Sequence, residues 1–209
     1  MKKFNRKAHW ETIYQTKKFE ETGWYQQTPV TSLAFVAKLK LPHTARIIDV
    51  GGGDSYFVDH LLDLGFENIT VLDISKTAIA RAKARLGERA KKVHWIVCDV
   101  SQFKPAQQYD FWHDRAAFHF LTEEREIEHY LRTIRDCLAE NGFLVIGTFS
   151  EQGPKTCSGI PVHQYSEASM TEKLGQFFER IECITLDHLT PFNTTQHYLF
   201  CSFKQLNLN

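Results

Sequence analysis

The sequence lacks the features that direct a chain to a membrane, a nucleic acid or an oxidising compartment. It has no long apolar run, so we expect no membrane span, and its basic N-terminus has no apolar core of the kind that a signal peptide needs. The formal net charge of its 209 residues is zero, which excludes a strong overall field toward polyanions. With 43% hydrophobic and 24% charged residues, the composition is that of an ordinary globular domain.

Cysteine is scarce and scattered. The chain has five cysteines and no C-x-x-C pair: Cys98, Cys137, Cys157, Cys183 and Cys201. This pattern predicts reduced thiols and a cytoplasmic protein rather than a disulfide framework. The histidines form no H-E-x-x-H motif, and their nearest grouping with an acid lacks a supporting pair, so we expect no metal site.

The most informative stretch is Ile47-Ile48-Asp49-Val50-Gly51-Gly52-Gly53-Asp54-Ser55. A β-branched run leads into an acid and three glycines, and a helical pattern of apolar residues follows. A strand, a glycine turn and a helix in this order present the backbone to a nucleotide-like ligand. The glycines permit positive φ angles and leave no Cβ to block close approach.

The residues around this turn argue against a dinucleotide. The fingerprint G-x-G-x-x-G/A requires a small residue where this chain has Tyr56, and Asp54 would repel a phosphate at the start of the helix. Acids on both sides of the turn, Asp49 and Asp54, suit a cation instead. S-adenosylmethionine carries a sulfonium, an ammonium and a ribose diol but no phosphate, and it is the predicted ligand; a tight turn with no ligand is the alternative.

The hydrophobic patterns alternate as expected for a doubly wound α/β domain with a mostly parallel sheet. We predict strands at residues 46–50, 68–73, 93–97, 109–112 and 143–149, followed by an antiparallel pair at 180–186 and 197–203. We predict helices at 28–40, 57–64, 76–86, 122–139 and 166–178, with Ser75 and Thr122 as N-caps.

Residues 1–28 are predicted to form an aromatic arm that precedes a single domain of residues 29–209. Trp10 and Tyr14 lie four positions apart and share a helix face, and Trp24 follows the helix-breaking Gly23. The arm either packs passively on the domain or acts as a lid that places Trp10 and Trp24 against a bound cofactor.

Three acids stand at the ends of successive strands, where open α/β sheets bind their ligands. They occur in the pairs Asp49-Val50, Asp73-Ile74 and Asp99-Val100. Asp73 follows Gly51 by 22 positions, close to the offset at which a carboxylate accepts from both ribose hydroxyls. Asp99 can accept from an adenine amine while the Val100 N–H donates to a ring nitrogen. A single acid at a strand end is commonly a turn former, but three together predict an adenosine site.

The runs D-V-G-G-G-D-S, V-L-D-I-S and C-D-V resemble those of class I S-adenosylmethionine-dependent methyltransferases, and the resemblance covers about residues 9–204. The runs H-W-E-T-I-Y, W-H-D-R-A-A-F-H-F-L-T and T-F-S-E-Q-G-P-K-T-C-S-G are similar to a small bacterial subfamily. The opening also loosely resembles eukaryotic protein-lysine methyltransferases of this fold. One departure is Ser55, which stands where the family has its third loop glycine.

The resemblance implies a seven-stranded sheet in the order 3-2-1-4-5-7-6 with only strand 7 antiparallel. It also implies cofactor contacts along the glycine turn and at the strand ends. The methionine moiety would lie near Asp49, Gly51, Gly52 and Gly53, the ribose on Asp73, and the adenine on Asp99 and Val100. Val50, Ser55 and Ile74 are further candidate cofactor contacts.

Methyl transfer depends mainly on alignment and exclusion of water, and a general base is needed only when the acceptor must lose a proton. His113, Asp114 and His119 are the candidates near the sulfonium, and His113 is also a candidate cofactor contact. As alternatives, Asp114 forms an ion pair with Arg115 and His119 is a core histidine. Cys157 lies in the loop expected over the acceptor pocket, where a spectator thiol is the alternative to a functional one.

The sequence therefore predicts a methyltransferase that uses S-adenosylmethionine and acts on a small molecule or a protein side chain. Two alternatives stay open: a nicotinamide-dependent reductase on the same sheet and a non-catalytic adenosine-binding regulatory module. The basic run from Lys76 to Lys92 is interpreted as a solvated helix face, so no nucleic-acid partner is expected. Nothing in the sequence identifies the acceptor atom or the oligomeric state.

Overall fold

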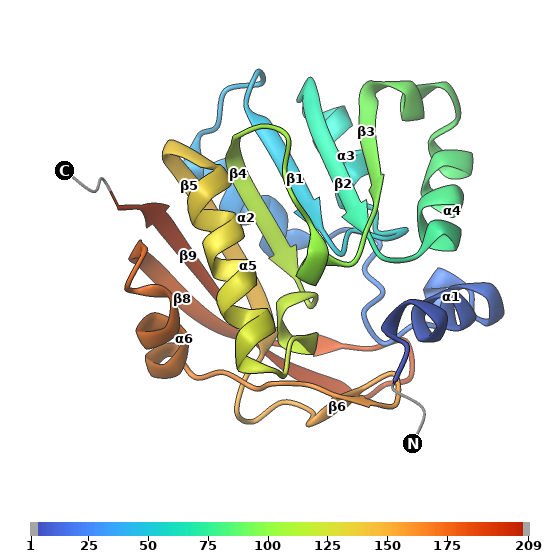
Figure 1. Ribbon diagram of the computed structural model, residues 1–209. Coiled ribbons are helices and arrows are strands. Elements are labelled where there is room, and N and C mark those ends of the chain that lie inside the picture. The colour runs from blue at the N-terminus through green and yellow to red at the C-terminus, as the bar shows by residue number, and fades with distance from the viewer. Residues whose placement is uncertain (1–3, 207–209) are drawn as a thin grey trace.

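The computed structural model describes residues 4–206, so the predictions for residues 1–3 of the arm and 207–209 of the domain lie outside the described residues. Its centre is a seven-stranded sheet in the order β3-β2-β1-β4-β5-β9-β8 (Figure 1). The strands are β1 (Arg46–Val50), β2 (Asn68–Asp73), β3 (Val93–Val97), β4 (Tyr109–Arg115), β5 (Leu138–Phe149), β8 (Phe178–Leu189) and β9 (Thr195–Gln205).

The sheet has the predicted doubly wound topology. β1 pairs in parallel with β2 and β4, and the chain order reverses between these two neighbours. β9 is the last strand in the chain and pairs antiparallel with both β5 and β8, so the order is 3-2-1-4-5-7-6 when these seven strands are counted along the chain. Ligands of such sheets bind at the carboxyl ends of the strands beside this switch point.

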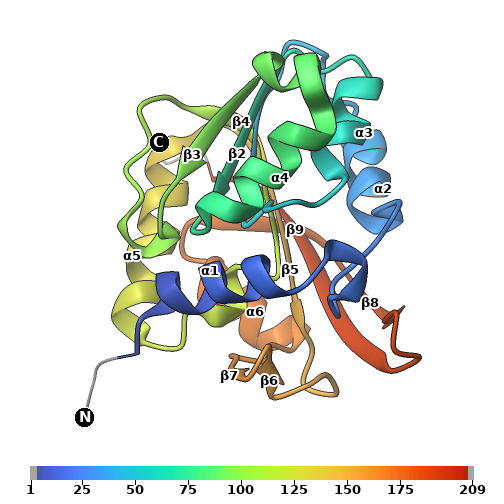
Figure 2. The same ribbon diagram turned by 90° about the vertical axis from the view of Figure 1, so that its right-hand side faces the viewer.

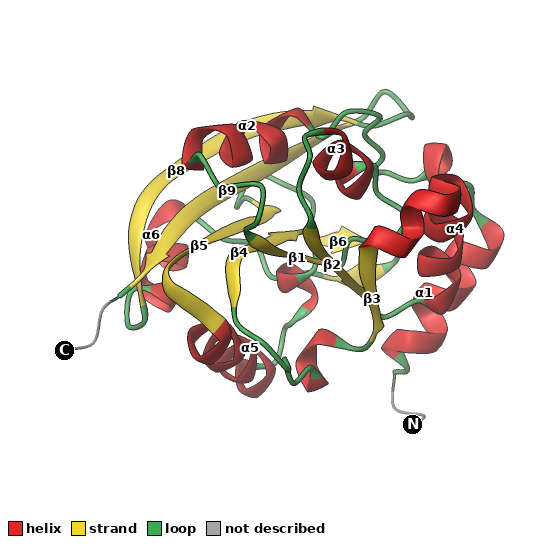
Figure 3. Ribbon diagram, turned by 90° about the horizontal axis from the view of Figure 1, so that it is seen from above, coloured by secondary structure: helices red, strands yellow, loops and turns green. Residues whose placement is uncertain are grey.

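Helices cover both faces of the sheet (Figure 3). α2 (Val30–Leu39), α3 (Phe57–Asp63) and α4 (Lys76–Leu86) share one apolar cluster with one face, whereas α5 (Glu124–Cys137) and α6 (Glu167–Leu174) share another with the opposite face. The helical spacing of their apolar residues explains these positions, because Phe57, Val58 and Leu61 form one buried side of α3. None of the helices in residues 4–206 combines the length and apolar character needed to cross a bilayer.

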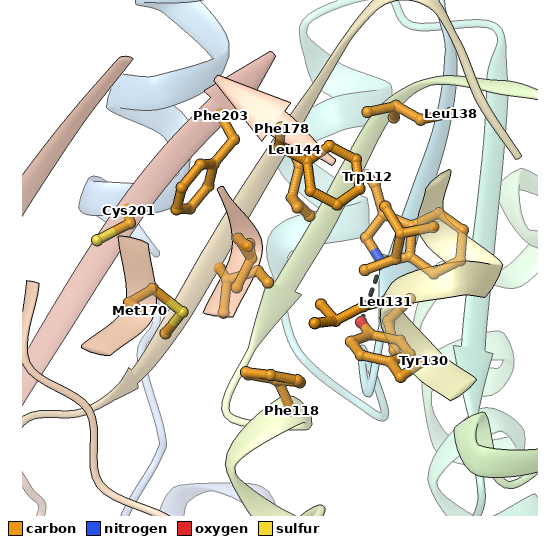
Figure 4. Packing of buried hydrophobic residues seen from close by; sticks show 14 of the residues in the cluster. Trp112, Phe118, Tyr130, Leu131, Leu138, Leu144, Met170, Phe178, Cys201 and Phe203 are labelled. Atoms are coloured by element: carbon orange, nitrogen blue, oxygen red, sulfur yellow. Dashed lines mark hydrogen bonds between the residues drawn. The ribbon is translucent and has the colours of Figure 1, made fainter. Parts of the chain in front are cut away.

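The core beneath α5 is rich in aromatic rings (Figure 4). The indole N–H of Trp112 on β4 donates to the Tyr130 hydroxyl on α5 across 3.0 Å, and the Tyr130 ring stacks on Phe118 at a centroid distance of 5.5 Å. Such a ring pair contributes about 1 kcal/mol beyond the burial of its area. These contacts fix α5 against the strand that carries His113 and Asp114.

Several elements differ in extent from the prediction. β4 continues to Arg115, three residues beyond the predicted end, because His113 and Asp114 pair with both β1 and β5. α5 is preceded by Glu123 rather than Thr122 and passes directly into β5 at Leu138, which pairs with Tyr109 below a register shift. The final strands are longer than predicted, and their antiparallel pairing is confirmed.

Short elements complete the chain. The loop after β5 contains a two-stranded ribbon of β6 (Thr156–Cys157) and β7 (Ile160–Pro161), which the sequence analysis did not predict. The arm contains α1 (Arg6–Thr16). Short 3-10 helices lie at Phe19–Glu21, Gly87–Lys92, Val100–Gln102 and Phe118–Phe120.

The prediction that all cysteines are unpaired is wrong for one pair. Cys183 on β8 and Cys201 on β9 are joined by a disulfide. They lie directly opposite each other in the antiparallel register, so the hairpin brings together two residues that are 18 positions apart. Within residues 4–206 the other three cysteines, Cys98, Cys137 and Cys157, are free.

Candidate active site

The glycine turn after β1 requires glycine at two positions. Gly51 and Gly53 have φ angles of +68° and +51°. A Cβ on Gly51 would lie 2.7 Å from the Cβ of Ala117, and one on Gly53 would lie 2.7 Å from the Tyr14 hydroxyl oxygen. The backbone N–H groups of Gly51 and Gly52 both donate to the Leu72 carbonyl, at 2.8 and 3.3 Å, which ties the turn to the end of β2.

A cavity lies where the carboxyl ends of β1, β2 and β3 meet the glycine turn, and we call it the rim cavity. It contains about 750 Å³ of atom-free space and is bounded on three sides. One side consists of strand ends, including Val50, Gly51, Asp73, Ile74, Asp99 and Val100. The arm contributes Arg6, Trp10, Tyr14 and Trp24, and a third side consists of Arg115, Ala116, Ala117, Phe120, Cys157 and Tyr198.

Asp73 provides a buried carboxylate at the end of β2. Its side chain is 4% exposed, and one oxygen accepts from the Ser75 backbone N–H at 2.8 Å. Burial raises the pKa of Asp73 to about 7, against the hydrogen bond from Ser75, and the nearby charges of Asp54 and Asp49 act in the same direction as burial. The carboxylate therefore lacks sufficient stabilisation in the free protein, and two hydroxyl donors would supply it.

Asp99 already has partners inside the protein. Its Oδ1 accepts from the Ser101 N–H at 2.9 Å and from the Ser101 hydroxyl at 2.8 Å. The Arg6 guanidinium contacts both oxygens at 3.2 and 3.3 Å and bridges to Glu126 at 2.7 Å. Because a carboxylate has about four acceptor positions, these contacts leave room on Oδ2 for one further donor.

The arm is both packed and part of the cavity. Glu11 on α1 reaches the start of α4, where its carboxylate accepts from the Lys76 N–H at 2.6 Å, the Thr77 N–H at 3.2 Å and the Ser75 hydroxyl at 3.1 Å. These groups are unpaired donors of a helix N-terminus, so Glu11 caps α4 from another element. Figure 2 shows α1 running beneath the strand ends beside α4.

The aromatic residues of the arm meet over the cavity. Trp10 lies edge-to-face with Trp24 and Phe120, with ring centroids 5.8 and 5.0 Å apart. Tyr14 is buried beside Trp24, and both line the cavity. The aromatic residues that pack the arm on the domain are therefore also the residues with which the arm lines the cavity.

A second and smaller cavity, which we call the inner cavity, continues from the rim cavity beneath the glycine turn. It contains about 370 Å³ of atom-free space. Its polar residues include Ser32, Asp49, Ser55, His113 and Arg115. It shares Tyr14, Trp24, Gly51 and Arg115 with the rim cavity, so the two are adjacent.

A hydrogen-bonded chain forms one wall of the inner cavity. The Nδ1 of His113 lies 2.7 Å from Asp49 Oδ1, and its Nε2 lies 2.9 Å from the Ser32 hydroxyl. A carboxylate can only accept, so Nδ1 carries the hydrogen of this imidazole. Both partners are nearly fully buried, which fixes the orientation of the Asp49 carboxylate.

Asp114 and His119 line neither cavity. The Asp114 carboxylate is fully buried and accepts from the Tyr130 hydroxyl at 2.6 Å and from the N–H groups of Ala117 and Phe118. Burial raises its pKa to about 6, although these hydrogen bonds oppose the shift. The His119 Nδ1 accepts from the Phe149 N–H at 3.2 Å, and burial, aided by Arg115, lowers the pKa of His119 to about 3. The alternative Asp114–Arg115 ion pair is also not formed among the ion pairs of residues 4–206.

The third side of the rim cavity is assembled from distant parts of the chain. Cys157 comes from β6, Tyr198 from β9, and Arg115 from the end of β4. Burial raises the pKa of Cys157 to about 11 and that of Tyr198 to about 12. Both groups are therefore neutral near pH 7, so Arg115 is the charged group of this side.

The structure thus gathers most of the residues that the sequence analysis selected. Trp10, Trp24, Val50, Gly51, Asp73, Ile74, Asp99 and Val100 line the rim cavity, and Trp24, Asp49, Gly51, Gly52, Ser55 and His113 line the inner cavity. Gly53 lines neither but lies under Tyr14 and Asp73. The sequence analysis missed Arg6, Tyr14, Arg115 and Tyr198 as cavity residues. Two of them had a usable indication, because Tyr14 shares a helix face with Trp10 and Arg115 follows the candidates His113 and Asp114 at a strand end.

No group of three or more His, Cys, Asp or Glu side chains within residues 4–206 has the spacing to hold a metal ion. A sequence model of the family described as "Methyltransferase domain" matches residues 48–144, which run from β1 into β5 and include the glycine turn and all three strand-end acids.

Residues 48–144 thus resemble a methyltransferase domain, and the sheet has the strand order of the class I methyltransferase fold.

Curated relatives of this methyltransferase domain include the mouse (Mus musculus) "eEF1A lysine and N-terminal methyltransferase", which is 27% identical over 143 residues, or 68% of this chain and 20% of the relative. Nodulation protein S of Sinorhizobium fredii is 29% identical over 136 residues, which is 65% of this chain and 62% of the relative. The chain spans about a fifth to a third of the length of the first eEF1A methyltransferases that it matches.

Solved structures support the fold of the domain. N-methyltransferase NodS from Bradyrhizobium japonicum, solved in complex with S-adenosyl-l-homocysteine, superposes with a TM-score of 0.73 at 18% identity. The match covers 96% of this chain and 99% of that structure. It therefore includes the arm and the final hairpin, which lie outside the family match.

Proposed function

We propose that this protein is a methyltransferase that uses S-adenosylmethionine as its methyl donor. The observation that carries the proposal is the arrangement of Asp73, Asp99 and Val100 around one cavity that opens beside the glycine turn. A ribose diol and an adenine ring need these acceptors and donors at the ends of adjacent strands. The relatives described as methyltransferases support the proposal.

The residues fit the donor in chemical terms. Asp73 would hold the ribose, because its pKa of about 7 reflects a carboxylate that is buried with too few donors. Val100 and the remaining acceptor position of Asp99 would hold the adenine, while Arg6 keeps the Asp99 carboxylate in place. Asp49, fixed by His113, would face the ammonium of the methionine portion.

When bound, the donor supplies a methyl group on a positively charged sulfur. The protein contributes alignment and exclusion of water, which are the main requirements of a displacement at carbon. Trp10, Tyr14 and Trp24 close the cavity from the arm side. We assign Asp114 and His119 to the support of β4 and the following turn, because both are fully buried and hydrogen-bonded outside the cavities.

The acceptor is proposed to be a small molecule or a protein side chain. The relative described as an eEF1A lysine and N-terminal methyltransferase supports the protein acceptor. The rhizobial relative supports a bacterial source. The three free cysteines support a cytoplasmic location, against which the Cys183–Cys201 disulfide stands. The neutral net charge supports neither a nucleic-acid nor a membrane partner.

The first experiment separates the proposal from a nicotinamide-dependent reductase. Calorimetric titration with S-adenosylhomocysteine, NADH and NADPH should show micromolar binding of the first ligand and no binding of the other two. A micromolar dissociation constant corresponds to a binding free energy of about 8 kcal/mol in magnitude. Binding of NADH or NADPH alone would reverse the assignment.

The second experiment separates an enzyme from a non-catalytic binding module. The protein is incubated with donor labelled in the methyl group and with a fractionated bacterial lysate. Transfer of label into a protein or small-molecule fraction supports the enzyme and identifies the acceptor class. A Gly53→Ala variant, which crowds Tyr14 and Asp73, serves as the inactive control. Binding without transfer to any fraction would favour the regulatory module.

A further inference from the structure

Arg115 is a half-buried cation that has no counter-ion within residues 4–206. Its Nη1 donates to the Trp24 carbonyl at 3.0 Å, and its guanidinium carbon lies 5.1 Å from the centroid of the Tyr198 ring. Among the ion pairs of residues 4–206, none involves Arg115. A guanidinium has five N–H donors, so most of its hydrogen-bonding capacity faces the cavities that it lines.

Other arginines near the glycine turn are paired. Arg81 contacts Asp54 at 3.2 Å, Arg85 contacts Asp59 at 2.7 Å, and Arg6 contacts Glu126 at 2.7 Å. Arg115 differs from them because it is held in place by a carbonyl and an aromatic face rather than by an acid. A partly desolvated guanidinium that has no acidic partner is stabilised by a bound anionic ligand.

The inner cavity places this cation together with one acid. Asp49 and Arg115 are the residues of opposite formal charge along its wall. Ser32 and Ser55 line the same cavity. One fixed carboxylate and one unpaired guanidinium match the ammonium and the carboxylate of an α-amino acid. The inner cavity also joins the rim cavity at Gly51, so a ligand can occupy both.

We infer that Arg115 binds the α-carboxylate of the donor's methionine portion and, with Asp49, makes the inner cavity specific for an amino-acid zwitterion. This inference rests on the proposed function and adds a specificity-determining residue to it. Because Arg115 also holds the Trp24 carbonyl, the same contact links the occupied inner cavity to the arm.

The test compares two ligands that differ only in this carboxylate. S-adenosylhomocysteine carries it, whereas S-adenosyl-3-thiopropylamine is the same molecule without it. In calorimetric titration, wild-type protein should bind S-adenosylhomocysteine about 10- to 100-fold more tightly, which is the range for charge-assisted hydrogen bonds. In Arg115→Gln this ratio should fall to within about 3-fold, and Arg115→Lys should retain part of it because the charge remains.

Two features keep this experiment interpretable. Binding of the decarboxylated ligand reports whether Arg115→Gln is folded, and Arg135→Gln is a matched control, because Arg135 on α5 also lies 5.1 Å from an aromatic centroid but lines neither cavity. If Arg115→Gln weakens both ligands equally, or neither, Arg115 does not bind the carboxylate and the inference is wrong while the proposed function stands. If wild type binds neither ligand, the proposed function fails and takes the inference with it.

Discussion

Two sides of the rim cavity are built in different ways. The strand-end side is local, because Asp73, Asp99 and the glycine turn each lie at or just after the end of a strand. The third side combines Arg115, Cys157 and Tyr198 from three elements that lie far apart in the sequence. This difference teaches that the strand-end side is encoded in short motifs, whereas the third side depends on how the whole chain packs.

The largest effect is expected from the strand-end side, in Gly53→Ala. A Cβ there would lie 2.7 Å from the Tyr14 hydroxyl and 3.1 Å from an Asp73 oxygen, in a backbone with φ of +51°. We expect S-adenosylhomocysteine affinity to fall by roughly 100-fold and unfolding free energy by about 2–4 kcal/mol, measured by calorimetry and urea denaturation.

Gly87→Ala is the matched control for this variant. Gly87 also has a positive φ of +57°, but a Cβ there would have no neighbour within 4 Å. It should therefore cost only the backbone strain of this sparsely populated conformation, about 1–3 kcal/mol, and leave S-adenosylhomocysteine binding unchanged. Equal losses in the two variants would show that crowding by Tyr14 and Asp73 plays no part.

The next effect concerns the third side of the rim cavity and should distinguish it from the strand-end side. The Cys183–Cys201 disulfide closes the β8–β9 hairpin that carries Tyr198. Reduction with dithiothreitol should lower unfolding free energy by about 3 kcal/mol, as expected for closure of a loop of this length, and change S-adenosylhomocysteine affinity by less than about 3-fold. The measurement is urea denaturation with and without reductant.

Cys137→Ser should show the same difference between oxidised and reduced protein, because Cys137 is a free cysteine on α5. A large loss of cofactor affinity on reduction would show that the two sides are not independent, and no loss of stability would show that the disulfide is absent in solution.

A smaller effect is expected from Asp73→Asn. The amide retains the shape of the side chain but removes the charge that accepts from a ribose diol, so S-adenosylhomocysteine affinity should fall about 10-fold in calorimetry. In the wild type, affinity should increase as pH rises from about 6 to about 8, because binding favours the ionised carboxylate and the pKa of Asp73 is about 7 in the free protein. In Asp73→Asn this pH dependence should be lost.

The same pKa predicts a stability effect of the opposite sign. The folded protein holds the Asp73 proton up to about pH 7, whereas the unfolded chain releases it near the ordinary value of 3.8. The folded state therefore binds more protons in this window, and the contribution of Asp73 to unfolding free energy falls as pH rises from about 4 to about 7 and is constant above it. The unfolding free energy of Asp73→Asn minus that of wild type should therefore be larger at pH 8 than at pH 4. If this difference is the same at both pH values, the raised pKa is contradicted. Asp63→Asn, at an exposed acid, is the control.

Much of the fold could be predicted because hydrophobic period and capping residues act locally. The seven-stranded topology and its order follow from alternating strands and helices together with the resemblance, and Ser75 caps α4 as predicted. Element ends were harder. The continuation of β4 to Arg115 depends on partners in β1 and β5, which no local window contains.

The site was predictable to a similar depth. Acids at strand ends converge in any parallel sheet, so Asp73 and Asp99 could be assigned to one cavity before the structure. By contrast, His113 could not be distinguished from Asp114 or His119, because burial and partners decide which of them reaches a cavity. Arg6 and Tyr198 enter through the packing of α1 and the register of β9, and the Cys183–Cys201 bond follows from the same register.

The reversed direction of β9 has a consequence for the hairpin that it forms with β8. Because β9 runs against its neighbours, it begins at the edge where the parallel strands finish, and the hairpin tip at residues 190–194 stands beside the glycine turn's end of the sheet. At that end the His188 imidazole on β8 lies 2.9 Å from the Gly23 carbonyl, so the hairpin contacts the arm. The tip itself lies beyond the last paired residues, Leu189 and Thr195, so its length can change without altering the register of the sheet.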